Sequence, residues 1–150
     1  MRTINDQTIT LRPQSDGATA EIMIAGRPTG HVIDGIVLEA ALACDGEFVL
    51  FVTTDTPYEE TLSIYLIDGD GVVLDSACIG APYATGSFSN LRIAGPDSVR
   101  FRFIGGTDWT LRVLASPRFR LPFAGNVRGV RQPFGFRRRL IIDGNPEPQD

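Results

Sequence analysis

The chain has 150 residues, of which 43% are hydrophobic and 21% charged, the composition of an ordinary globular protein. A chain of this length can form one domain whose core needs no disulfide or metal ion. No apolar run approaches the roughly eighteen residues of a membrane helix, and the N-terminus lacks the apolar stretch of a signal peptide. We therefore expect a single soluble domain in the cytoplasm, with no membrane partner.

Charge is the most informative part of the composition, because all fourteen basic residues are arginine and they are unevenly placed. Residues 1–90 hold three Arg against thirteen Asp and Glu, a net charge of −10. Residues 91–150 hold eleven Arg against five acidic residues, a net charge of +6. A GC-rich genome would also explain the lack of lysine, but it would not explain this segregation, which indicates two oppositely charged halves.

Turn signals divide the first part of the chain into short strands, with no helix expected. In chain order, strands are predicted at residues 3–12, 18–25, 32–44, 48–52, 61–67 and 72–79, with turns or breaks at 13–17, 26–30, 45–46 and 68–71 and a loop at 80–86. Part of 32–44 would suit a helix, but Asp45-Gly46 before an apolar run favours a hairpin. The unbroken apolar run at 48–52 indicates a strand covered on both faces.

Residues 88–115 show the clearest pattern, a meander of three strands with strict alternation of apolar and polar side chains. The apolar positions are Leu91 and Ile93, then Val99, Phe101 and Phe103, then Trp109, Leu111 and Val113. Turns are predicted at residues 95–97 and 105–108. One face of this sheet is therefore expected to be buried around Trp109 and the other to be exposed.

The exposed face of the meander is predicted to carry arginines on neighbouring strands. A three-residue loop at 95–97 puts Arg92 opposite Arg100, and the next hairpin is expected to put Arg112 opposite Arg100 or Arg102. Like charges directly opposite each other destabilise a sheet, so a counter-charge is expected from the acidic residues 1–90, an anionic ligand or a partner.

The remaining tail is rich in Arg, Phe, Gly and Pro. We expect irregular or edge structure over 118–139 and a short strand at 140–142, followed by a loose tail. The predicted fold class is all-β: a single antiparallel β-sandwich, jelly-roll-like or Greek-key, formed by residues 1–117. Residues 118–143 are predicted as an arm or edge segment of the same domain, and 144–150 as a flexible tail.

No constellation of residues predicts catalysis or a cofactor. His31 is the only histidine and stands at a strand start, which favours a structural role. The motif Asp68-Gly69-Asp70-Gly71 begins like a calcium loop but continues with Val72, so a plain turn is expected; Asp55, Glu59 and Glu60 could add ligands only by accident of folding. Cys44 and Cys78 are expected to be buried thiols rather than a disulfide. We therefore predict no metal site and no cofactor.

The arginines of the tail interleave with aromatic residues, as in nucleic-acid-binding segments. The sequence pI of about 4.9 argues against this reading, and we expect no nucleic-acid partner.

The leading functional hypothesis is a non-catalytic protein that self-associates or binds an acidic protein through its oppositely charged halves. The residues predicted to form the interaction face are Arg92, Arg100, Arg102, Arg112, Arg137, Arg138 and Arg139. The alternative is a binding module for an anionic or carbohydrate ligand, using the sheet face or the 80–90 loop with Tyr83. An enzyme is the weakest of the three hypotheses.

Overall fold

A computed structural model describes residues 1–4, 7–54, 61–80, 87–103, 107–119, 130–132 and 137–144, without the side chains of 116–119 and 137. Every regular element in these ranges is a β-strand, and every pairing between strands is antiparallel. The strands are β1 (Arg2–Thr3), β2 (Ile9–Pro13), β3 (Thr19–Ile24), β4 (Arg27–Asp34), β5 (Val37–Cys44), β6 (Glu47–Thr53), β7 (Leu62–Ile67), β8 (Val73–Ile79), β9 (Ser89–Ile93), β10 (Ser98–Arg102), β11 (Asp108–Phe119), β12 (Val130–Arg131) and β13 (Arg137–Gly144). The predicted all-β antiparallel sandwich is confirmed.

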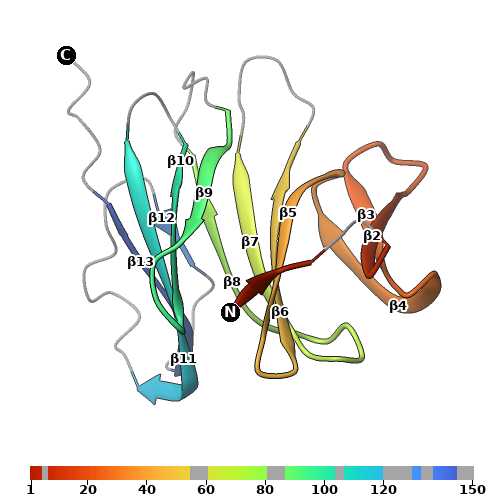
Figure 1. Ribbon diagram of the computed structural model, residues 1–150. Helices are drawn as coiled ribbons and strands as arrows, with labels where there is room; N and C mark the ends of the chain where they lie inside the picture. Colours follow the sequence, from red (N-terminus) through yellow and green to blue (C-terminus); the bar gives the residue numbers. More distant parts are fainter. Residues whose placement is uncertain are drawn as a thin grey trace.

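Three sheets are stacked side by side, with the largest in the middle (Figure 1). The central sheet has the order β1-β5-β6-β7-β8-β12. On one side lies the four-stranded sheet β13-β11-β10-β9, and on the other the three-stranded sheet β2-β3-β4. Within the described residues, no helix is long and apolar enough to cross a membrane.

The central sheet is buried on both faces, because each outer sheet packs a separate hydrophobic core against it. Val49 and Phe51 of β6 belong to the core shared with the four-stranded sheet, whereas Leu50 and Val52 belong to the core shared with the three-stranded sheet. All four are fully buried. The prediction that the apolar run 48–52 is covered on both faces is therefore confirmed.

The predicted break at 26–30 is wrong, because β4 already begins at Arg27. The single strand predicted over 32–44 is also wrong, because β4 ends at Asp34 and β5, from Val37, belongs to another sheet. Ala25 and Gly26 both have positive φ and form a two-residue hairpin turn between β3 and β4. Pro28 is tolerated because β4 is an edge strand of its sheet, where a missing N–H costs little. Between Glu21 and Met23 the register shifts by two residues of β4, and Gly30, with a φ of 79°, lies in the resulting bulge.

Both predicted Asp-Gly turns, at 45–46 and at 68–71, connect neighbouring antiparallel strands. Asp45 and Gly46 have φ values of 49° and 79° and join β5 to β6 in a tight hairpin. In the turn between β7 and β8, the Asp68 carboxylate accepts hydrogen bonds from the backbone N–H groups of Asp70 and Val72, at 2.9 and 3.0 Å. The carboxylate of Asp68 is thus used to close a turn, as expected for a plain Asp-Gly motif.

The described part of the C-terminal segment forms edge strands. β12 pairs with β8, and β13 pairs with β11, so the predicted short strand at 140–142 extends over Arg137–Gly144. Residues 120–129, 133–136 and 145–150 lie outside the described ranges.

The pairing of β11 with β13 is interrupted between Val113 and Arg118, where the register shifts. The backbone N–H groups of Arg139 and Leu140 instead donate to Asp75 Oδ2 on β8, at 2.9 and 3.0 Å. The guanidinium of Arg138 donates to Asp75 Oδ1 at 3.1 Å. One buried carboxylate therefore joins the central sheet to the edge of the four-stranded sheet.

Candidate binding face

The outer face of the four-stranded sheet carries the arginines that the alternation of residues 88–115 predicted. Val99, Phe101, Trp109 and Leu111 are fully buried on the inner face. The arginines that alternate with them point away from the core and are exposed. Ile93 of β9, which was predicted on the buried face, is 45% exposed, so that prediction is wrong at this position. We name the outer positions Arg92, Arg100, Arg102 and Arg112 the arginine face.

Of the two cross-strand arginine pairs predicted for the arginine face, one is confirmed and one is wrong. Arg92 lies opposite Arg100, as expected. Arg112 lies opposite Ser98, so the prediction that it faces Arg100 or Arg102 is wrong. In the observed register Trp109 lies opposite Phe101, and its indole N–H donates to the Phe103 carbonyl at 2.9 Å.

Asp108 supplies part of the counter-charge. Its carboxylate lies 3.6 Å from the Arg92 guanidinium and 3.3 Å from Arg102 Nε. This carboxylate comes from the four-stranded sheet itself, which is none of the three expected sources: residues 1–90, an anionic ligand or a partner. Both arginine side chains remain nearly half exposed, at 48% and 46%, so these pairs are solvated and worth about 0–1 kcal/mol each.

Arg100 is the centre of the arginine face. Arg92 is directly across from it, which places their Cβ atoms about 5 Å apart, and Arg112 lies on the diagonal at about 7–8 Å. Among the described residues, neither Arg100 nor Arg112 has an ion pair. With Asp108 and Asp143 as its described acidic residues, the outer face keeps a net charge of +2.

The structure separates Arg138 and Arg139 from the arginine face. Arg138 is buried against Asp75, with 9% of its side chain exposed. Arg139 forms a two-bond fork to Glu47 at 2.6 and 2.9 Å, and its Nε donates to the Leu114 carbonyl at 2.6 Å. Acidic residues of the first half therefore neutralise these two arginines within the chain. Arg137 pairs through its backbone with Phe119, and its side chain lies outside the described part of the structure.

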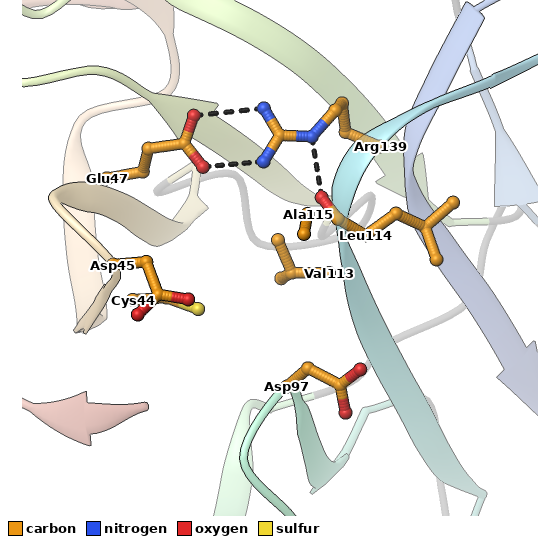
Figure 2. Close-up of a pocket in the computed structure, with 8 residues that line it drawn as sticks. All are labelled: Cys44, Asp45, Glu47, Asp97, Val113, Leu114, Ala115 and Arg139. Carbon is orange, nitrogen blue, oxygen red and sulfur yellow. Dashed lines mark hydrogen bonds and ion pairs between the residues drawn. The ribbon is translucent and has the colours of Figure 1, made fainter.

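A hollow of about 270 Å³ lies where the central and four-stranded sheets meet (Figure 2). It is lined by Cys44, Asp45, Glu47, Asp97, Val113, Leu114, Ala115 and Arg139. Figure 2 shows the Arg139–Glu47 fork on one side of the hollow, with Asp45 and Asp97 apart from it. The Val113 N–H donates to the Asp97 carbonyl at 2.9 Å, so Asp97 pairs with a buried residue of the inner face and lies on the side of the sheet away from Arg112.

The electrostatics of the hollow follow from its carboxylates. Burial, together with the negative charges of Asp45, Glu47 and Asp97, raises the pKa of the Cys44 thiol. A thiol that holds its proton is a poor nucleophile and a poor metal ligand. The hydrogen bond to Glu47 raises the pKa of Arg139, so this guanidinium stays charged. The arrangement suits binding of a positive group better than covalent chemistry.

Other predicted candidates do not assemble into a site within the described ranges. His31 lies on β4, partly exposed, with its backbone N–H donating to Thr29 Oγ1. Cys44 and Cys78 are free thiols, the first buried and the second partly exposed. No group of three or more His, Cys, Asp or Glu in the described residues could hold a metal ion. Asp55, Glu59, Glu60 and Tyr83 lie outside those residues.

Comparisons with family models, curated proteins and solved structures found no match to this chain.

Proposed function

We propose that this protein is a non-catalytic interaction module that binds an acidic protein surface through the arginine face. The observation that carries the proposal is Arg100, an exposed arginine directly opposite Arg92 and without an ion pair among the described residues. An acidic partner would relieve the repulsion between Arg92 and Arg100, which is about 0.2–1 kcal/mol for a directly opposed pair.

An exposed sheet face favours a macromolecular partner over a small ligand, because small ligands bind in concave pockets. Arginine suits such a surface, since its planar guanidinium forms two parallel hydrogen bonds to a carboxylate and arginine is enriched at protein interfaces. Asp108 and Asp143 on the same face disfavour a polyanion as uniform as nucleic acid, since they would repel its phosphates. A protein surface that mixes acceptors and donors fits this pattern better.

The proposal is tested with a fluorescent polyglutamate peptide and fluorescence anisotropy. The wild type should bind the peptide at about 0.05 M salt and lose binding at about 0.5 M salt, where the Debye length falls to a few Å. Arg100→Glu should weaken binding by about tenfold or more, because it reverses the charge at the centre of the face. Arg27→Glu is the matched control, since Arg27 is exposed on the opposite outer sheet, and it should leave most of the affinity intact.

Two results would overturn the proposal. Equal loss of affinity in both variants would mean that net charge, and not the arginine face, governs binding. Tighter Arg100-dependent binding of a DNA oligonucleotide of equal charge would assign the face to nucleic acid instead.

A further inference from the structure

β9 is the last strand of the four-stranded sheet, and among the described residues its far edge has no neighbouring strand (Figure 1). The Ala94 N–H donates to the Ser98 carbonyl at 3.0 Å, so Ala94 bonds toward β10. Because bonded and non-bonded pairs alternate in an antiparallel ladder, Arg92, opposite Arg100, also bonds toward β10. Ile93 lies between these two residues, so its backbone N–H and C=O point toward the open edge.

The side chain of Ile93 offers an apolar contact at the same edge. Ile93 lies across from Val99, which is fully buried, yet 45% of Ile93 is exposed. Leu91, on the same side of β9, is partly buried against the core shared with the central sheet. A strand added beyond β9 would therefore cover Ile93 with one more apolar residue at the margin of that core.

The outer side of the open edge is positively charged. Arg92 lies between Arg100 and the open edge, and the 3.6 Å approach of Asp108 leaves its side chain 48% exposed. Toward the open edge Arg92 occupies a non-hydrogen-bonded position, where antiparallel neighbours come closest, with Cα atoms about 4.5 Å apart. A carboxylate on the residue opposite Arg92 would therefore reach its guanidinium.

The charge of Arg92 and a bulge beside it limit what can occupy the edge. A second copy of β9 would place two Arg92 side chains on one face, and like charges on neighbouring strands are destabilising. Asn90 and Leu91 lie opposite the single residue Phe101, and Asn90 has a φ of 55°. Regular pairing is thus confined to the end of β9 that begins at Arg92. This edge fits a short extended segment in which acidic and apolar residues alternate.

We infer that the acidic partner binds as an extended segment that adds a strand to the β9 edge. An acidic residue of the segment lies opposite Arg92, and an apolar residue lies opposite Ile93, where the two backbones exchange a pair of hydrogen bonds. This inference rests on the proposed function, because it names the form in which the acidic partner meets the arginine face.

Binding of N-methylated peptides tests the inference. The probe is a capped, fluorescently labelled pentapeptide, Glu-Val-Glu-Val-Glu, whose valine N–H groups would face β9 and whose glutamate N–H groups would face away. Methylation of both valine nitrogens should weaken binding at least about tenfold, because it removes the donor to the Ile93 carbonyl and puts a methyl group between the strands. Methylation of two glutamate nitrogens is the matched control and should leave the affinity unchanged.

Two measurements on the protein locate the bound peptide. Amide hydrogen exchange at Ile93 should slow about tenfold at a peptide concentration about ten times Kd, whereas Arg92, already bonded to β10, should change less. Ile93→Ser should weaken peptide binding about fivefold or more, because it removes the apolar contact. Val32→Ser is the matched control, since Val32 is 52% exposed on β4 of the opposite outer sheet, and this variant should bind like the wild type.

Equal binding of the two methylated peptides, or unchanged exchange at Ile93 while the peptide is bound, overturns the inference. If polyglutamate still binds in an Arg100-dependent manner in that case, the proposed function stands, and the acidic partner meets the face without adding a strand. If neither polyglutamate nor the pentapeptide binds, both the inference and the proposed function fail.

Discussion

Truncation of Asp75 is the sharpest perturbation of the fold, because three separate groups of β13 depend on this one carboxylate. Its side chain is 4% exposed and accepts from the Arg138 guanidinium and from the N–H groups of Arg139 and Leu140. In Asp75→Ala, Arg138 becomes a buried charge without a partner, and three backbone donors, the N–H groups of Ser76, Arg139 and Leu140, lose their acceptor.

The size of the effect follows from these losses. Removing one member of a buried ion pair costs about 3–5 kcal/mol. Each orphaned backbone N–H adds about 1–3 kcal/mol, reduced where water enters the gap. We therefore expect the free energy of unfolding to fall by at least about 3 kcal/mol, a large share of the roughly 5–15 kcal/mol of a typical domain.

Urea unfolding followed by Trp109 fluorescence measures this loss. Asp75→Asn keeps one carbonyl oxygen as acceptor and should lose less than Asp75→Ala. Combining Asp75→Ala with Arg138→Met removes both charges, so the double variant should be more stable than the sum of the single losses predicts. A loss below about 1 kcal/mol in Asp75→Ala, or simple additivity in this cycle, would refute the role given to the carboxylate.

Two further predictions concern Cys44 and Gly144. Because burial raises the pKa of Cys44, the unfolded chain releases the thiol proton at a lower pH than the folded chain does. The free energy of unfolding therefore falls as the pH rises above the pKa of the thiol in the unfolded chain. Cys44→Ala should therefore flatten the decline in stability between about pH 8 and about pH 10, and an unchanged slope would contradict the assignment. A Cβ added at Gly144 would overlap the indole ring of Trp109, so Gly144→Ala should destabilise the protein by about 1–3 kcal/mol. Denaturation followed by tryptophan emission checks this, and a neutral result would mean that β13 moves away without cost.

Short-range patterns predicted most of the fold. The period-two alternation around Trp109 identified the buried and exposed faces of the meander, and the Asp45-Gly46 pair located a hairpin. Both signals work because the residues that cause the structure are adjacent in sequence. The prediction of a break at 26–30 was wrong because the structure accommodates Pro28 on an edge strand and Gly30 in a bulge, and neither residue ends the strand.

The candidate face was only partly predictable. Its exposed arginines followed from alternation, but the pairing of Arg112 with Ser98 depends on how Trp109 packs, which loop length alone does not reveal. Arg138 and Arg139 stand in a run of three arginines, and their sequence alone does not distinguish them from exposed arginines of an interaction face. Their partners lie 63 and 92 residues away in sequence, and only the three-dimensional fold brings Asp75 and Glu47 to them.

The central claim is that the arginine face is the surface that binds an acidic partner. The most direct measurement follows backbone amide shifts in two-dimensional NMR spectra while polyglutamate peptide is added at low salt. We predict that the shifts concentrate on β9, β10 and β11 around Arg92, Arg100 and Arg112, and that they disappear in Arg100→Glu. Shifts centred instead on the three-stranded sheet, or spread evenly over all three sheets, would contradict the claim.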